Sequence, residues 1–274
     1  MKRLLSYFVF WKIYLKGALF SIGLPYKLFK SLNFFRHGPN DDLDYTSKTL
    51  KFHTDRIPIG VVGYNILELG PGESLLQGVL SFEHGRNYHD FVDQGDFASD
   101  STKKYFERSV LFNGVDFEPR NFRIRYFTEG LKSMIDLNTS SYLCIYSQAV
   151  MEHISRHEVE QYYNQMFRLL VNGGYISHQV DLTDHLNGGL NHLTKSNRFY
   201  ESSFVKKSLN YVNRLSLKQH LRFIENAGFS NIEFQLERSN GVLLRENRIN
   251  SDYISHFSED DLTIKGFHVV AQKT

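Results

Sequence analysis

Seven short apolar segments, separated by amphipathic stretches, most constrain how this chain of 274 residues folds. The segments are residues 65–69, 88–92, 123–127, 142–146, 175–180, 232–236 and 266–272. Apolar strands that alternate with helical stretches are typical of a mainly parallel sheet with helices on both faces. A chain of this length can bury most of its surface in one core, so we predict a single large α/β domain.

Local signals also predict where two helices begin and end. Ser155 and Glu158 have the spacing of a capping box, which should start a helix between the fourth and fifth strands. Gly173-Gly174 should end that helix, because glycine adopts the required conformation at little steric cost. A second helix is predicted within residues 216–228.

Composition excludes several classes of protein. Lys and Arg total 32 against 30 Asp and Glu, so no general positive field attracts DNA or RNA, and we expect no nucleic-acid partner. The single cysteine, Cys144, lies in an apolar run and is predicted to be a buried thiol. One cysteine excludes an internal disulfide and a cysteine-based zinc site, which fits a cytoplasmic protein.

Residues 1–50 are predicted to form an amphipathic helical extension to a domain at 51–274. Their apolar and aromatic stretch is interrupted by Lys12 and Lys16. A membrane span needs about 20 mostly apolar residues, so the charges argue against one. The extension could lie in a membrane interface or pack on the domain or a partner, which leaves a peripheral position at the inner face of the membrane open.

Residues 66–74 carry the most informative local signal, because an apolar strand leads through a glycine turn into a helix. Gly70 and Gly72 let the backbone approach a ligand closely and leave N–H groups available at a helix start. A dinucleotide site expects a third glycine where Leu75 stands, which disfavours a nicotinamide-dependent oxidoreductase. Glu68, just before the turn, favours a cationic ligand over a pyrophosphate.

The run Glu68-Leu69-Gly70-Pro71-Gly72 resembles the first motif of class I S-adenosylmethionine-dependent methyltransferases. Segments 146–154, 169–176 and 226–229 are similar to that family's segments after the fourth strand, before the fifth and before the sixth. The resemblance covers about residues 60–274. It implies a Rossmann-like, doubly wound seven-stranded sheet with an antiparallel last strand, and S-adenosyl-L-methionine as the cofactor.

The resemblance also implies which residues bind the cofactor. Asp93, about 20 residues beyond the glycines, would accept hydrogen bonds from the ribose hydroxyls, with Asp96 as a substitute. Thr128 and Glu129 would contact adenine, where the family often has an acidic residue. The complete expected set is Glu68, Gly70, Pro71, Gly72, Asp93, Thr128, Glu129, Ser147 and Gln148.

The methyl acceptor should lie beyond the carboxyl ends of the strands, beside a long polar insert at about residues 182–215. A poorly acidic hydroxyl acceptor needs a base, and histidine suits that task near neutral pH. The candidate catalytic residues are His153, His178, His185 and the orienting Asp181.

Other roles for these residues stay open. Each histidine could instead be a structural hydrogen-bonding residue. Asp184 is an alternative partner for an imidazole, and Asp181, Asp184 and His185 together could hold a divalent cation that binds a sugar diol. A metal is not the expected cofactor.

The leading interpretation is an O-methyltransferase that acts on a small molecule or a glycan hydroxyl. The insert resembles those of bacterial methyltransferases associated with surface polysaccharides. The alternative is a catalytically silent binding or scaffold protein with the same fold. A polar pocket facing the cofactor would favour the enzyme and a blocked one the scaffold, while the sequence leaves formation of a homodimer open.

Overall fold

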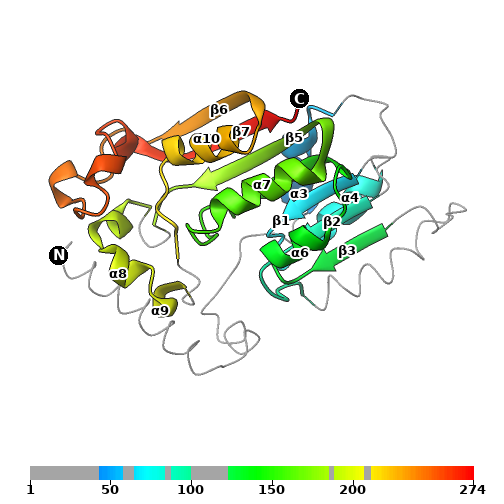
Figure 1. Ribbon diagram of the computed structural model, residues 1–274, viewed down its shortest axis with the longest axis horizontal. Helices are drawn as coiled ribbons and strands as arrows, with labels where there is room; N and C mark the ends of the chain where they lie inside the picture. Colours follow the sequence, from blue (N-terminus) through cyan, green and yellow to red (C-terminus); the bar gives the residue numbers. More distant parts are fainter. Residues whose placement is uncertain (1–42, 58–64, 84–87, 100–122, 185–187, 207–210) are drawn as a thin grey trace, which may run out of the picture.

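The computed structural model describes residues 43–57, 65–83, 88–99, 123–184, 188–206 and 211–274. Within them, seven strands form one sheet in the order β3-β2-β1-β4-β5-β7-β6 (Figure 1). The strands are β1 Asn65–Leu69, β2 Tyr88–Val92, β3 Arg123–Phe127, β4 Tyr142–Gln148, β5 Leu170–Asp181, β6 Ser230–Arg238 and β7 Ile264–Gln272.

Strand directions agree with the sequence prediction. β1 pairs in parallel with β2 and β4, β3 extends the parallel set beyond β2, and β5 extends it beyond β4. β7 is antiparallel to both of its neighbours, β5 and β6. The doubly wound α/β sheet with an antiparallel last strand is therefore confirmed.

Helices cover both faces of the sheet. The α-helices are α3 Leu43–Thr54, α4 Leu76–Glu83, α6 Leu131–Asp136, α7 Val159–Leu169, α8 Asn197–Tyr200, α9 Ser203–Lys206 and α10 Leu217–Asn226. Short 3-10 helices occupy Asn191–Thr194, Glu246–Arg248, Ile254–His256 and Asp261–Thr263. α6, α7 and α10 share one core with the sheet, and α3 packs on the opposite face.

The two apolar layers explain this arrangement. Met166 of α7 and Ile224 of α10 are fully buried against Ile176 of β5. On the other face, Leu50 of α3 packs with the buried Cys144, as predicted for that thiol. Burial of a side chain of this size contributes about 1.5–3 kcal/mol, so each face holds its helices mainly through apolar packing.

The predicted domain boundary at residue 50 falls inside α3. Residues of the helix before and after this position, such as Thr46 and His53, are buried. Residues 1–42 of the predicted extension lie outside the described residues. No helix in the described part of the chain is long and apolar enough to cross a membrane.

The prediction for the first helix was wrong in two details. Glu158 makes no side-chain cap bond; instead the Ser155 carbonyl accepts hydrogen bonds from the N–H groups of Glu158, at 2.8 Å, and Val159, at 3.2 Å. α7 also ends at Leu169 rather than at the glycines, because Leu170 is extended and pairs with Tyr142 of β4. Pairing within the sheet thus ended the helix before the glycine signal.

The insert after β5 packs against a second long connection, residues 239–263 between β6 and β7, which the sequence analysis did not predict. Both lie at the same end of the sheet (Figure 1). Their shared apolar cluster consists of Leu190, Leu193, Leu244, Ile249, Tyr253, Phe257 and Leu262. The two connections therefore form one small layer beyond the carboxyl ends of the parallel strands.

Candidate active site

A cavity of about 270 Å³ lies where β1, β2 and β4 end. Its wall combines the glycine turn, the end of β2, the segment after β4 and the insert. The residues that matter most for its chemistry are Gly70, Gly72, Asp93, His153, Lys206 and Tyr211. This is the edge of a parallel sheet at which doubly wound proteins bind ligands.

The turn after β1 needs glycine. Gly70 has φ 65° and Gly72 has φ 66°, a left-handed conformation that other residues adopt only with strain. A Cβ atom on Gly70 would stand 2.5 Å from Cγ2 of Val150, which also lines the cavity. The Gly70 N–H donates to the Val92 carbonyl at 2.8 Å and ties the turn to the end of β2.

Asp93 stands directly opposite this turn. Its Oδ2 accepts a hydrogen bond from the Gly72 N–H at 3.2 Å, and its Oδ1 accepts one from the Gln94 N–H at 2.7 Å. Burial raises the pKa of the Asp93 carboxyl to about 6, although these two N–H groups partly oppose the shift. The carboxylate is thus held in the cavity wall, where it can accept hydrogen bonds from a diol.

His153 is the predicted catalytic histidine that lines the cavity. Its Nδ1 lies 2.7 Å from the Tyr211 carbonyl, which can only accept, so Nδ1 must carry the proton. Nε2 is then the basic nitrogen of the neutral ring. An imidazole held in this way can take a proton from a bound acceptor.

Next to His153 lies a buried carboxyl that the sequence analysis did not single out. Glu152 is fully buried, and neither carboxyl oxygen has a hydrogen-bond partner within the described residues. Its Oε1 lies 4.0 Å from Nε2 of His153. Burial raises the pKa of this carboxyl well above its usual range, which favours its neutral form.

Glu68, a predicted cofactor contact, does not line the cavity. Its carboxylate is buried and accepts a hydrogen bond from the Tyr146 hydroxyl at 2.6 Å. His89 Nε2 lies 3.6 Å from the same oxygen. Burial raises the pKa of Glu68 to about 8. The side chain therefore makes its polar contacts inside the sheet, with Tyr146 and His89.

Other predicted cofactor residues also lie away from the cavity lining. Ser147 Oγ is 2.8 Å from Nδ1 of His178, and Gln148 Oε1 is 3.0 Å from Nε2 of His53. Glu129 is exposed and pairs with Lys132. Pro71 and Thr128 are likewise absent from the lining.

Two further predicted catalytic residues, His178 and Asp181, do not line the cavity. His178 is fully buried between Ser147 and Met166, and burial lowers its pKa well below the usual range. Asp181 Oδ1 accepts hydrogen bonds from the Thr183 N–H and hydroxyl. His185 lies outside the described residues.

The alternative cation site is incomplete in the described part of the chain. Asp184 Oδ2 accepts hydrogen bonds from the Asn191 backbone N–H at 2.7 Å and side-chain amide at 2.9 Å. Within the described residues, no three His, Cys, Asp or Glu side chains are grouped to hold a metal ion.

Several lining residues escaped prediction. They are Gln94, Phe97, Tyr162, Lys206 and Tyr211. Gln94 follows Asp93 directly, so its position was available as a signal. Lys206 and Tyr211 belong to the insert, and no local pattern marks them.

Comparisons with known proteins bear on the fold. No family model matches the chain, and no curated protein matches it in sequence. Among solved structures, the chain is similar to phosphoethanolamine N-methyltransferase 2 of Haemonchus contortus with bound S-adenosyl-L-methionine. The TM-score is 0.53 at 16% identity, over 84% of this chain and 52% of that chain. The fold is that of class I methyltransferases.

A second similar structure is the geranyl diphosphate C-methyltransferase of Streptomyces coelicolor, solved with Mg²⁺, geranyl diphosphate and S-adenosyl-L-homocysteine. Its TM-score is 0.50 at 12% identity, over 83% of this chain and 79% of that one. The chain spans about half the length of the nematode enzyme. At these identities the class I methyltransferase fold is what the two proteins share with this chain.

Proposed function

We propose that this protein is an S-adenosyl-L-methionine-dependent methyltransferase. The glycine turn, Asp93 and His153 line the same cavity, and this observation carries the proposal. Doubly wound proteins bind their ligands outside the carboxyl ends of the strands, which is where this cavity lies. Solved neighbours that contain S-adenosylmethionine or S-adenosylhomocysteine support the choice of cofactor.

The residues present fit such a cofactor. Gly70 and Gly72 hold the left-handed turn at the cavity wall, and Asp93 offers carboxylate oxygens to a ribose diol. When bound, the cofactor supplies an electrophilic methyl group on a sulfonium. The sequence-based contacts of Glu68, Pro71, Thr128, Glu129, Ser147 and Gln148 remain predictions, because these residues do not line the cavity.

His153 is the proposed general base. The Tyr211 carbonyl fixes the ring with Nδ1 protonated, so Nε2 can accept the proton that an acceptor hydroxyl would lose. Alignment of the two reactants in the cavity supplies the rest of the rate enhancement. His178 is too enclosed to reach an acceptor without rearrangement of the core.

The acceptor class we propose is a small molecule or a glycan with a reactive hydroxyl. The insert contributes Lys206 and Tyr211 to the cavity wall, which adds an ammonium and a tyrosine to a lining that is otherwise mainly apolar. These groups support the enzyme over the scaffold protein. A membrane-peripheral extension and a homodimer remain predictions about parts or assemblies outside the described residues.

Calorimetric titration with S-adenosylhomocysteine tests the function. We expect micromolar binding to the wild type and strong weakening in Gly72→Arg, which fills the turn, and in Asp93→Ala, which removes the ribose partner. Lys218→Met, on the exposed side of α10, is the matched control and should bind normally. Absence of binding to folded wild-type protein would overturn the proposal and favour the scaffold.

A further inference from the structure

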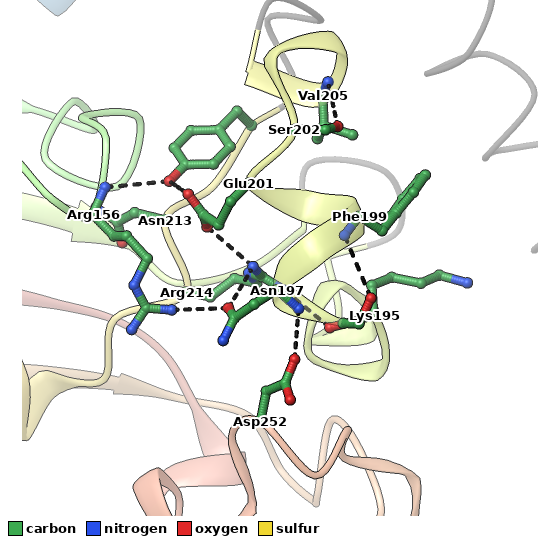
Figure 2. A network of polar contacts seen from close by, with 12 residues as sticks. Arg156, Lys195, Asn197, Phe199, Glu201, Ser202, Val205, Asn213, Arg214 and Asp252 are labelled. Atoms are coloured by element: carbon green, nitrogen blue, oxygen red, sulfur yellow. Dashed lines mark hydrogen bonds and ion pairs between the residues drawn. The ribbon is translucent and has the colours of Figure 1, made fainter.

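The insert contains a buried cation, Arg214, which forms an ion pair with Glu201 (Figure 2). Arg214 has no exposed side-chain surface; its Nη2 donates to Glu201 Oε1 at 3.0 Å and to Asn197 Oδ1 at 3.2 Å. Its Nη1 donates to the Lys195 carbonyl at 3.0 Å, and its guanidinium stacks 4.3 Å from the Tyr200 ring centroid. A buried guanidinium needs a counterion, and among the described residues Glu201 is the carboxylate that contacts it.

Glu201 is shared with the cavity wall. Its Oε2 accepts a hydrogen bond from the Tyr211 hydroxyl at 3.0 Å and lies 3.3 Å from the Nζ of Lys206. Because Arg214 is completely enclosed while the Lys206 side chain is 30% exposed, the single negative charge mainly compensates Arg214. Lys206 therefore presents incompletely compensated positive charge to the cavity.

The ammonium of Lys206 has capacity for a ligand. An ammonium has three N–H donors, and the polar contacts of Lys206 within the described residues are Glu201 Oε2 and Ser155 Oγ, both at 3.3 Å. Those distances are longer than the usual 2.9–3.0 Å of an N–H···O hydrogen bond. A negatively charged oxygen in the cavity would make a shorter and stronger bond.

A second arginine, Arg156, joins the polar network around Arg214 through Asn197. Arg156 donates to Asn197 Oδ1 at 3.3 Å and to the Tyr253 hydroxyl at 2.9 Å, and contacts no carboxylate within the described residues. The other carboxylate of the network, Asp252, accepts a hydrogen bond from the Asn197 backbone N–H (Figure 2). Arg156 therefore adds a positive charge to this network without a carboxylate contact of its own among the described residues.

We propose that the methyl acceptor carries an oxyanion group, phosphate or carboxylate, which Lys206 binds. The inference rests on the proposed function and deepens it. Tyr211 separates the two relevant side chains: its carbonyl holds His153, and its ring centroid lies 5.9 Å from the Nζ of Lys206. His153 and Lys206 both line the cavity, so one acceptor bound there can present a hydroxyl to His153 and an oxyanion to Lys206.

Inorganic phosphate and acetate are the probes, titrated at constant ionic strength into protein saturated with S-adenosylhomocysteine. At least one should bind, and Lys206→Met should weaken that binding at least tenfold, since a hydrogen bond to a charged group is lost. Lys206→Arg should keep most of the affinity. Lys218→Met is the control for a lysine outside the cavity and should match the wild type.

The outcomes separate the two proposals. Equal anion affinity in wild type and Lys206→Met, or no binding of either probe, overturns the oxyanion site while binding of S-adenosylhomocysteine still supports the methyltransferase. Failure of S-adenosylhomocysteine to bind contradicts the function itself. Unchanged melting temperature and S-adenosylhomocysteine affinity in Lys206→Met show that the variant keeps the folded cavity.

Discussion

The turn after β1 places two demands on residue 70, a positive φ and the absence of a Cβ atom. Gly70→Ala must adopt φ 65° and also place its Cβ 2.5 Å from the Val150 side chain. We expect a loss of roughly 2–4 kcal/mol in the free energy of unfolding, from backbone strain and overpacking together. Urea denaturation measures this loss.

Gly173→Ala is the matched control for this prediction. Gly173 has φ 82°, but a Cβ there meets no atom within 4 Å, so it tests the backbone strain alone. Gly70→Ala should be clearly more destabilising than Gly173→Ala. Equal losses would show that Val150 moves aside without cost.

The raised pKa of Asp93 predicts how cofactor binding responds to pH. With a pKa of about 6 in the folded protein, the carboxyl is ionised above pH 6 and protonated below it. The ionised form accepts two hydrogen bonds from a diol, so affinity for S-adenosylhomocysteine should fall as pH drops below 6, by up to about tenfold per pH unit. Calorimetry between pH 5 and 8 measures this dependence.

Asp93→Asn removes the titrating group and should flatten the pH dependence while weakening binding at neutral pH. Persistence of the same dependence in Asp93→Asn would assign it to another titrating group. The wild-type comparison at each pH separates this effect from general loss of stability at low pH.

At the scale of the elements, side chains cap the start of α10, whereas backbone hydrogen bonds and packing hold the start of α7. Ser216 and Gln219 form a complete capping box at α10. Ser216→Ala should lower the free energy of unfolding by about 1 kcal/mol. Ser155→Ala should cost less, because Ser155 supports the turn before α7 through its carbonyl, which the substitution keeps.

Urea denaturation of the two serine variants provides the measurement. A larger loss in Ser155→Ala than in Ser216→Ala would contradict the assignment of the caps. Affinity for S-adenosylhomocysteine should stay unchanged in Ser216→Ala, because α10 packs away from the residues that line the cavity.

At the scale of the whole molecule, Arg214 and Glu201 hold the insert together. Glu201→Gln leaves a buried guanidinium without its counterion, and we expect a loss of roughly 3 kcal/mol in the free energy of unfolding. Combination with Arg214→Met should cost less than the sum of the single losses, because the two side chains are coupled. Denaturant titration of the three variants measures the coupling.

The exposed pair Arg56–Glu233 is the control for charge removal. Both side chains are largely open to solvent, so Glu233→Gln should change stability much less than Glu201→Gln. Similar effects of the two substitutions would show that burial of Arg214 does not determine the strength of its ion pair.

The sequence by itself determined the sheet, the glycine turn and the position of Asp93. These features depend on residues that are neighbours in the chain. An apolar run predicts a strand, and Gly70 and Gly72 predict a turn that other residues adopt only with backbone strain. The seven apolar runs predicted the seven strands, whereas the antiparallel last strand was implied by the resemblance to class I methyltransferases, and the structure confirms both.

The tertiary structure decided which polar residues meet at the cavity. His153 and the carbonyl that orients it are 58 residues apart, and Arg156 meets Tyr253 across 97 residues. No local periodicity encodes such contacts, so three histidines were equally plausible bases and Lys206 carried no signal. Long-range packing buries His178 in the core, whereas it places His153 and Lys206 in the wall of one cavity.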